Sequence, residues 1–358
     1  MKKVFVLAVG LAMMLALAAC GSPTEEQPEE QIDYEIALVT DEGLIMDGGY
    51  SEVAWDAISA FGADNGKSHK YYKAAEASGE AYKNVIDDAV DRGAKIIIAD
   101  GYRFEDVIYD AQNEYKDVKF MIIDAEPIDP ETEEPKIAGN TAAVIFSSEE
   151  AGYMAGYAAV ENGASQLGFI GEADKATVTD YGYGFLQGAN DAAANNGVRV
   201  NIKYHSCREG GEKDAVVKKA SEWYEEGVEV IFACGPQVEM PVIESAELND
   251  GKVIACETDK SEMSDTILTS AIKDIGGVIN DMLEVYARDK FPGGEVLEYD
   301  ASTDSIWLDM ETSRFESFNG GDYKDLSKKL EDKDVTIVDN SVGGLRSLSL
   351  PNVTVSEE

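Results

Sequence analysis

From Glu35 onward, short apolar runs alternate with longer amphipathic stretches. The runs are bounded by Gly, Asp or Asn and cover residues 36–39, 95–99, 119–123, 167–170, 229–233 and 252–255. The stretches between them carry apolar residues at helical spacing, as in 53–61 and 81–90. Near-continuous apolar strands separated by helices are typical of parallel sheets that are covered on both faces. We therefore predict an α/β fold.

Two breaks in this alternation predict two lobes. The charged, Pro-containing stretch 125–135 cannot form a helix or a core, and near 266–273 a strand pattern precedes a long helix. We expect two Rossmann-like α/β lobes joined by a hinge, with the carboxyl ends of their strands facing one another across a cleft. The predicted boundaries are 34–145 plus about 265–295 for the N-terminal lobe, 146–264 plus about 296–340 for the C-terminal lobe, and 341–358 for a tail. Further candidate strands are 296–297, 306–308 and 335–338.

The N-terminus has the pattern of an export signal. Two lysines precede an uncharged stretch, 4–19, that is short for a membrane span of about 20 residues. Its end, Leu-Ala-Ala-Cys, resembles the lipobox of bacterial lipoproteins, which implies that residues 1–19 are removed and that Cys20 carries lipid. Residues 20–33 are acidic and predict a flexible tether. We expect a lipid anchor on the extracytoplasmic face of the cell membrane; the alternative is an ordinary signal peptide with a coincidental cysteine.

The charge of the chain excludes some partners. Thirty basic residues against 70 acidic ones leave a net charge of −40, and such a surface repels phosphate backbones, so we expect no nucleic-acid binding. Beyond Cys20 only Cys207, Cys234 and Cys256 remain, so at most one pair can form, and whether any pair forms stays open. Two histidines and no Cys-x-x-Cys predict no metal site.

Polar residues gather at the carboxyl ends of the predicted strands, where ligands bind in such folds. Asp41 follows the first strand, and Asp47, Tyr50 and Ser51 lie in the loop and at the start of the helix after it. The ends of later strands carry Asp124, Gly235, Glu257, Asp259 and Lys273. A single Asp at a strand end can also cap the next helix, and Lys273 can be a solvated lysine. Both alternatives stay open at this point.

Several short motifs occur in a fixed order along the chain. They are Val39-Thr40-Asp41 through Asp47, Tyr50 and Ala54-Trp55; 117–124 (DVKFMIID); Phe146 with 149–156 (EEAGYMAG); 184–188 (GFLQG); and 268–273 (LTSAIK). In this order they resemble the basic membrane protein family of nucleoside-binding lipoproteins, over roughly Tyr34 to Lys290. The resemblance implies a monomeric solute-binding component of an ABC importer, with a type I periplasmic-binding fold, a permease partner, no cofactor and no catalysis.

The resemblance also implies roles for the candidate residues. Tyr50 would stack on a nucleobase, which is worth about 1–3 kcal/mol per base, and Asp41 would read the edge of the base. Asp124, Asp259 and Lys273 would contact the ribose or the base edge, because carboxylates accept and an ammonium donates hydrogen bonds. A side chain in place of Gly235 would intrude on the ligand. The predicted site comprises Asp41, Asp47, Tyr50, Ser51, Asp124, Gly235, Glu257, Asp259 and Lys273.

The chain departs from the family pattern at this site. Tyr50-Ser51 stands where the family has Phe-Asn, and Lys260 where it has Gln. A second stacking aromatic is expected near 204–207, where Tyr204-His205-Ser206-Cys207 cannot be aligned uniquely. The ligand therefore need not be a standard purine nucleoside. Two other functions remain as alternatives: an extracytoplasmic sensor with the same fold, and, less favoured, an α/β enzyme acting on nucleosides or sugars.

Overall fold

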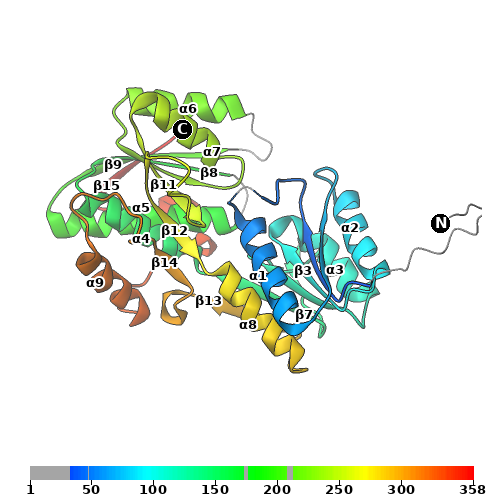
Figure 1. The fold of residues 1–358 in the computed structure, drawn as a ribbon. Coiled ribbons are helices and arrows are strands. Elements are labelled where there is room, and N and C mark those ends of the chain that lie inside the picture. Colours follow the sequence, from blue (N-terminus) through cyan, green and yellow to red (C-terminus); the bar gives the residue numbers. More distant parts are fainter. Residues whose placement is uncertain (1–32, 47, 173–175, 208–212) are drawn as a thin grey trace, which may run out of the picture. The chain divides into compact units, whose positions relative to one another are not determined.

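The computed structural model describes residues 33–46, 48–172, 176–207 and 213–358. The predicted signal peptide, Cys20, all but the last residue of the predicted tether, and Asp47 lie outside these residues. The described residues belong to one unit, Asp33–Glu358, which contains two large sheets (Figure 1). Among the residues that the structure describes, no helix has the length and apolar character needed to cross a membrane.

The first sheet is parallel throughout. Its order is β13 (Val296–Tyr299), β7 (Thr141–Phe146), β4 (Lys119–Ile123), β3 (Ile96–Asp100), β1 (Ile36–Thr40) and β2 (His69–Lys73). Alternate residues of a strand point to opposite faces, so Ile36 and Leu38 pack beneath α1 (Tyr50–Asn65) and α8 (Ile275–Ala287). Ala37 and Val39 pack beneath α2 (Gly79–Asp91) and α3 (Glu105–Glu114) on the other face.

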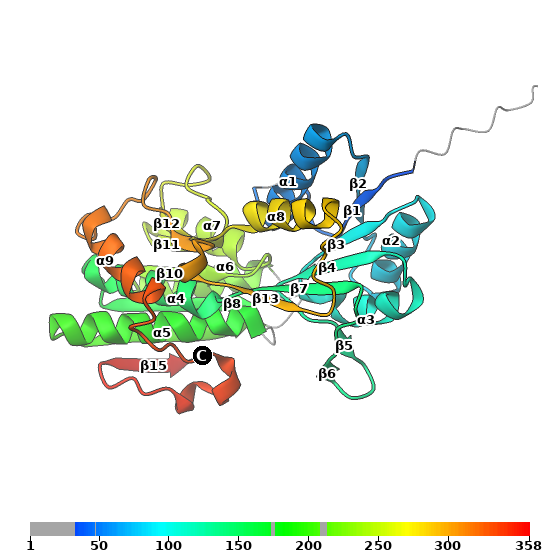
Figure 2. The same cartoon turned by 90° about the horizontal axis from the view of Figure 1, so that it is seen from below.

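The second sheet is parallel except for the antiparallel strand β14. Its order is β14 (Ile306–Leu308), β12 (Ile267–Lys273), β11 (Lys252–Glu257), β10 (Val230–Cys234), β8 (Gln166–Glu172), β9 (Val200–Cys207) and β15 (Val353–Glu357). One face packs against α4 (Ser148–Glu161) and α5 (Ala176–Asn196), and the other against α6 (Lys213–Glu225) and α7 (Glu239–Asn249). Figure 2 shows β15 in red at the edge of this sheet, and α9 (Gly320–Glu331) lies near α4.

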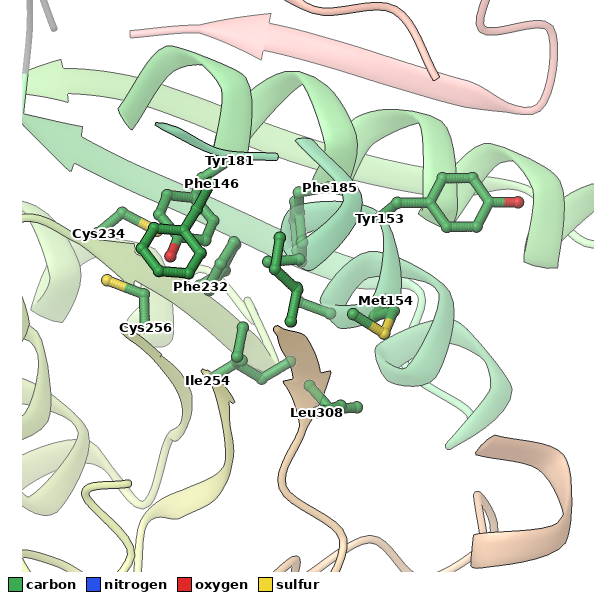
Figure 3. Packing of buried hydrophobic residues seen from close by; sticks show 14 of the residues in the cluster. Phe146, Tyr153, Met154, Tyr181, Phe185, Phe232, Cys234, Ile254, Cys256 and Leu308 are labelled. Carbon is green, nitrogen blue, oxygen red and sulfur yellow. The ribbon is translucent and has the colours of Figure 1, made fainter. Parts of the chain in front are cut away.

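The α/β class predicted from the sequence is confirmed, and two of the motifs have a structural explanation. Helices α4 and α5 approach closely through their glycines. A Cβ atom on Gly184 would lie 1.9 Å from the carbonyl oxygen of Glu149, and one on Gly156 would lie 2.1 Å from that of Phe185. The EEAGYMAG and GFLQG motifs are therefore needed for helix packing. Figure 3 shows the adjoining core, in which Phe146 of β7 lies near Tyr181 of α5.

Strand pairing differs from the predicted lobe boundaries at two places. The strand β12 lies within the range predicted for the N-terminal lobe, but it pairs in the second sheet. The strand β13 lies within the range predicted for the C-terminal lobe, but it pairs in the first sheet. The helix α8, between them, packs against α1 of the first sheet. The chain thus crosses between the sheets near Ser147, near Asp274 and between Asp300 and Ser305. The division into two hinged lobes stays a prediction, with these crossings as the candidate hinge.

The predicted strand at 335–338 is wrong. Its backbone pairs with a side chain instead of a strand: the Gln187 amide donates to the carbonyl of Val338 at 2.8 Å and accepts from its N–H at 2.9 Å. The charged stretch 125–135 forms a small antiparallel hairpin of β5 (Ile128–Asp129) and β6 (Glu134–Pro135).

Candidate functional site

A cavity of about 580 Å³ lies where strands of both sheets end. The first sheet contributes residues after β1, at the start of α1, and after β3, including the short helix η1 (Tyr102–Phe104); the second contributes residues after β10 and β11. The lining consists of Asp41, Gly43, Leu44, Gly49, Tyr50, Ser51, Asp100, Tyr102, Arg103, Pro236, Glu239, Met240, Glu257, Lys260 and Met263. A cavity of a few hundred cubic ångströms suits a small organic ligand.

The first-sheet wall carries a hydrogen-bonded acid. Strands β1 and β3 are in parallel register, with Val39 opposite Ala99, so Asp41 and Asp100 emerge at the same edge. The Ser51 hydroxyl, one residue into α1, donates a hydrogen bond to Oδ2 of Asp100. Burial, with smaller contributions from the nearby carboxylates of Asp41 and Glu257, raises the pKa of Asp100 to about 7 despite this bond.

Two aromatic rings belong to the same wall. Tyr50 begins α1, and its hydroxyl is buried and has no hydrogen-bond partner within the described part of the chain. Burial raises the pKa of Tyr50 well above its ordinary value, with a smaller contribution from the charge of Asp124. Tyr102 of η1 is the second ring. Tyr50 is therefore neutral at physiological pH, and both rings line the cavity.

Arg103 connects the two sheets. Its guanidinium lies 3.0 Å from Oε1 of Glu42, 3.6 Å from Oδ2 of Asp41 and 3.5 Å from Oε1 of Glu172, the last residue of β8. The side chain is only 7% exposed, so these carboxylates compensate a nearly buried charge. Asp41 also accepts a hydrogen bond from the N–H of Gly43 at 2.8 Å, which fixes its position after β1.

The second-sheet wall contains a buried ion pair. Nζ of Lys260 lies 3.0 Å from Oε2 of Glu239 and donates to the carbonyl of Cys256 at 2.8 Å and to Oγ1 of Thr258 at 3.0 Å. Glu239 also accepts from the N–H of Cys256 at 2.8 Å. All three donors of the ammonium are thus used. Burial raises the pKa of Glu257 above its ordinary value, although Lys273 and Lys260 oppose the shift.

The mouth of the cavity is apolar. Leu44 on the first-sheet side is 70% exposed, and Met240 and Met263 on the second-sheet side are 52% and 37% exposed. On this side Thr258 donates a hydrogen bond at 2.8 Å to the carbonyl of Gly48, which precedes α1. This bond and the ion pair from Arg103 to Glu172 join the two walls.

Four of the residues predicted from the sequence line this cavity: Asp41, Tyr50, Ser51 and Glu257. Asp124 and Lys273 do not. They pair with each other at 2.7 Å, almost completely buried, at the ends of β4 and β12, and so connect the sheets. Lys273 also lies 4.9 Å from the centre of the Tyr181 ring. Burial alone would lower the pKa of Lys273, but Asp124 and Glu257 more than offset it.

The remaining predicted residues have local structural roles. Asp259 is exposed, and its carboxylate accepts from the N–H and the hydroxyl of Ser261. Gly235 has a φ of +114°, and a Cβ atom there would lie 2.9 Å from Cβ of Glu172, so the backbone requires glycine. Tyr204 is buried against Phe169, with ring centres 4.8 Å apart, and is not among the residues that line this cavity. Cys207, Cys234 and Cys256 are free and buried.

Sequence reasoning missed several residues of the lining. Asp100 and Arg103 follow an apolar run, 95–99, that was assigned as a strand, so inspection of that strand end would have found them. Met240 lies in α7 and Met263 in a turn between β11 and β12. At both positions the hydrophobic periodicity of the sequence does not indicate that the side chain lines a cavity.

The comparisons with known proteins agree with this architecture. The family model "ABC transporter substrate-binding protein PnrA-like" matches residues 35–340. The chain is 25% identical to the ABC transporter nucleoside-binding protein BmpA of Lactococcus lactis, over 88% of this chain and 94% of that one. It is 24% identical to basic membrane protein A of Borreliella burgdorferi, over 83% and 87% of the two chains.

Solved structures support the fold. The ABC transporter solute-binding protein of Aeropyrum pernix superposes with a TM-score of 0.71 at 14% identity, over 86% of this chain and 94% of that chain. A solute-binding protein of Conexibacter woesei gives 0.66 at 16% identity, over 85% and 99%. The predicted type I periplasmic-binding architecture is thereby confirmed. Because the family model covers most of the sequence, the chain belongs to the family of PnrA-like ABC transporter substrate-binding proteins.

Proposed function

We propose that this chain captures a nucleoside-like ligand in the cavity between the two sheets and delivers it to the permease of an ABC importer. The observation that carries the proposal is the composition of the lining: aromatic rings, carboxylates and an apolar mouth converge from two sheets. The name of the Lactococcus lactis relative, a nucleoside-binding protein, supports the same class of ligand.

The chemistry of the lining suits a nucleoside. A base has two flat faces, and Tyr50 and Tyr102 offer rings for stacking, while Met240 and Met263 offer polarisable sulfur atoms from the other wall. Ribose hydroxyls are donors that the carboxylate of Glu257 can accept. A phosphorylated ligand would meet the carboxylates of the lining and the net charge of −40, so we propose an unphosphorylated ligand.

The predicted contacts of Asp124, Asp259 and Lys273 with the ligand remain proposals. For Asp124 and Lys273 they require the 2.7 Å ion pair to rearrange or to share the ammonium with a ribose hydroxyl. Glu257 is electrostatically coupled to both residues, which supports a connection between this pair and the cavity. In the alternative, the pair is a fixed link between the two sheets.

Transport would proceed by closure of the two walls on the ligand. The bonds from Thr258 to Gly48 and from Arg103 to Glu172 already join the walls, and a ligand that contacts both would favour this arrangement. We infer binding without catalysis, since the family is one of substrate-binding proteins. Lipid on Cys20 would hold a monomeric body near the permease at the outer face of the membrane.

A calorimetric titration of the folded protein with nucleosides, free bases, sugars and vitamins tests the proposal. We expect nucleosides to bind with 1:1 stoichiometry and to raise the melting temperature, because a ligand that binds only the folded state stabilises it. Binding of a sugar or vitamin, with no response to any nucleoside, would contradict the proposal.

A further inference from the structure

The polar groups of the cavity differ in how many of their hydrogen-bond donors and acceptors already have partners. Both cations are occupied: Lys260 by Glu239, Cys256 and Thr258, and Arg103 by the carboxylates around it. The acceptors on the first-sheet wall are only partly used. Among the described side chains of the lining, Ser51 and Asp100 therefore offer a ligand hydrogen-bond acceptors, whereas the two cations offer no free donor.

Ser51 and Asp100 form the centre of this acceptor surface. The single proton of the Ser51 hydroxyl is directed to Oδ2 of Asp100, so within the described residues the lone pairs of Ser51 and the second carboxylate oxygen remain as acceptors. Both residues line the cavity beside Tyr50, whose ring would define the plane of a stacked base. An edge of that base with N–H groups would fit the pair.

We propose that Ser51 and Asp100 act as one hydrogen-bonding unit that reads the edge of the base and selects bases carrying an exocyclic amino group. This assignment rests on the proposed function and adds a specificity determinant to it. Each amino proton that points at the pair gains a charge-assisted hydrogen bond to Asp100 when the acid is ionised. A base without the amino group leaves the second oxygen of that carboxylate without a ligand partner, which is costly.

Protonation of Asp100 changes what the pair reads. The groups facing it are the carboxylates of Asp41, Asp124 and Glu257 and the phenol of Tyr50, and Arg103 lines the same wall. With the pKa of Asp100 raised to about 7, the acid is protonated below neutral pH and ionised above it. The protonated acid is a donor, so affinity for an amino-bearing base falls as the pH drops through 7.

Two matched pairs of ligands test the assignment: guanosine against inosine, and adenosine against purine riboside, which differ only by the amino group. By calorimetry at pH 8, we expect the amino-bearing member of at least one pair to bind about tenfold or more tightly. In Asp100→Asn the ratio should shrink to within about threefold and lose its pH dependence. Ser51→Ala should reduce the ratio without abolishing binding.

Asp64→Asn is the control, because Asp64 is exposed near the opposite end of α1. It should leave the ratio and its pH dependence unchanged. Thermal melting of each variant shows whether it folds. Nucleoside binding with the same ratio in the wild type and Asp100→Asn would overturn the Ser51–Asp100 assignment alone. A folded wild type that binds no nucleoside would contradict the proposed function and, with it, the assignment.

Discussion

The two walls of the cavity differ in how their polar groups are used. On the second-sheet wall the charges of Lys260 and Glu239 satisfy each other, and the groups left for a ligand are the carboxylate of Glu257 and the apolar side chains of Pro236, Met240 and Met263. On the first-sheet wall the hydrogen-bonding capacity around Ser51 and Asp100 is still open. The comparison indicates that the first wall recognises the base, while the second wall covers it and offers Glu257 to the ribose.

The largest expected effect concerns the stability of the second wall. In Lys260→Met, Glu239 would lose its cation while both side chains of the pair are only 7% exposed, so we expect a loss of about 3–5 kcal/mol in the free energy of unfolding. Urea denaturation measures it. The control is Lys328→Met, whose ion pair with Asp332 is exposed and should contribute less than about 1 kcal/mol. Equal losses would mean that the Lys260 pair is not a structural element.

Recognition by the first wall is tested next. Tyr50→Ala removes the proposed stacking platform and should weaken nucleoside binding by about 1–3 kcal/mol in calorimetry. Tyr50→Phe keeps the ring and should retain most of the affinity. Tyr71→Ala is the control, because Tyr71 is exposed on β2, outside the cavity lining. If Tyr50→Ala binds like the wild type, the ligand does not stack there.

The buried ion pair between Asp124 and Lys273 gives a smaller expected effect. We expect Asp124→Ala to weaken nucleoside binding at least tenfold, which is about 1.4 kcal/mol. The reason is that it removes either a ligand contact or the partner of Lys273 at 2.7 Å. Lys273→Met, measured in parallel, shows whether binding needs Asp124 alone or the whole ion pair. An unchanged titration curve for Asp124→Ala would remove this residue from the site.

The smallest expected effect on binding concerns the apolar side chains of the second-sheet wall. Met240 is half exposed, so Met240→Ala should cost about 0.5 kcal/mol of binding free energy, at the low end for a sulfur–aromatic contact. Met240→Leu, which preserves volume, should cost less. A loss for Met240→Ala larger than that for Tyr50→Ala would reverse the roles assigned to the two walls.

Local sequence patterns predicted much of the fold because buried parallel strands are apolar throughout. The runs at 36–39 and 252–255 became β1 and β11. The edge strand β2 (HKYYK) lacks this pattern because most of it is not buried, and β15 was assigned to the tail. The stretch 335–338 has a strand composition, but a side chain from α5 takes its backbone hydrogen bonds, which no local pattern encodes.

The candidate site could be predicted only in part. Strand ends indicated Asp41 and Glu257, because the carboxyl edge of a parallel sheet is shared by all its strands. Which polar residues at that edge face the cavity depends on partners that are distant in sequence. Asp124 faces Lys273, 149 residues away, and Asp259 turns to Ser261. Met240 and Met263 line the same cavity only because the fold brings their segments together.

The central claim is that a nucleoside lies between the two walls, and a crystal structure of the protein with adenosine or guanosine tests it most directly. We predict electron density for the base against Tyr50, with its edge toward Ser51 and Asp100 and with Met240 and Met263 on the second-sheet side. Density for the nucleoside outside this cavity, or an empty cavity at saturating ligand, would contradict the account.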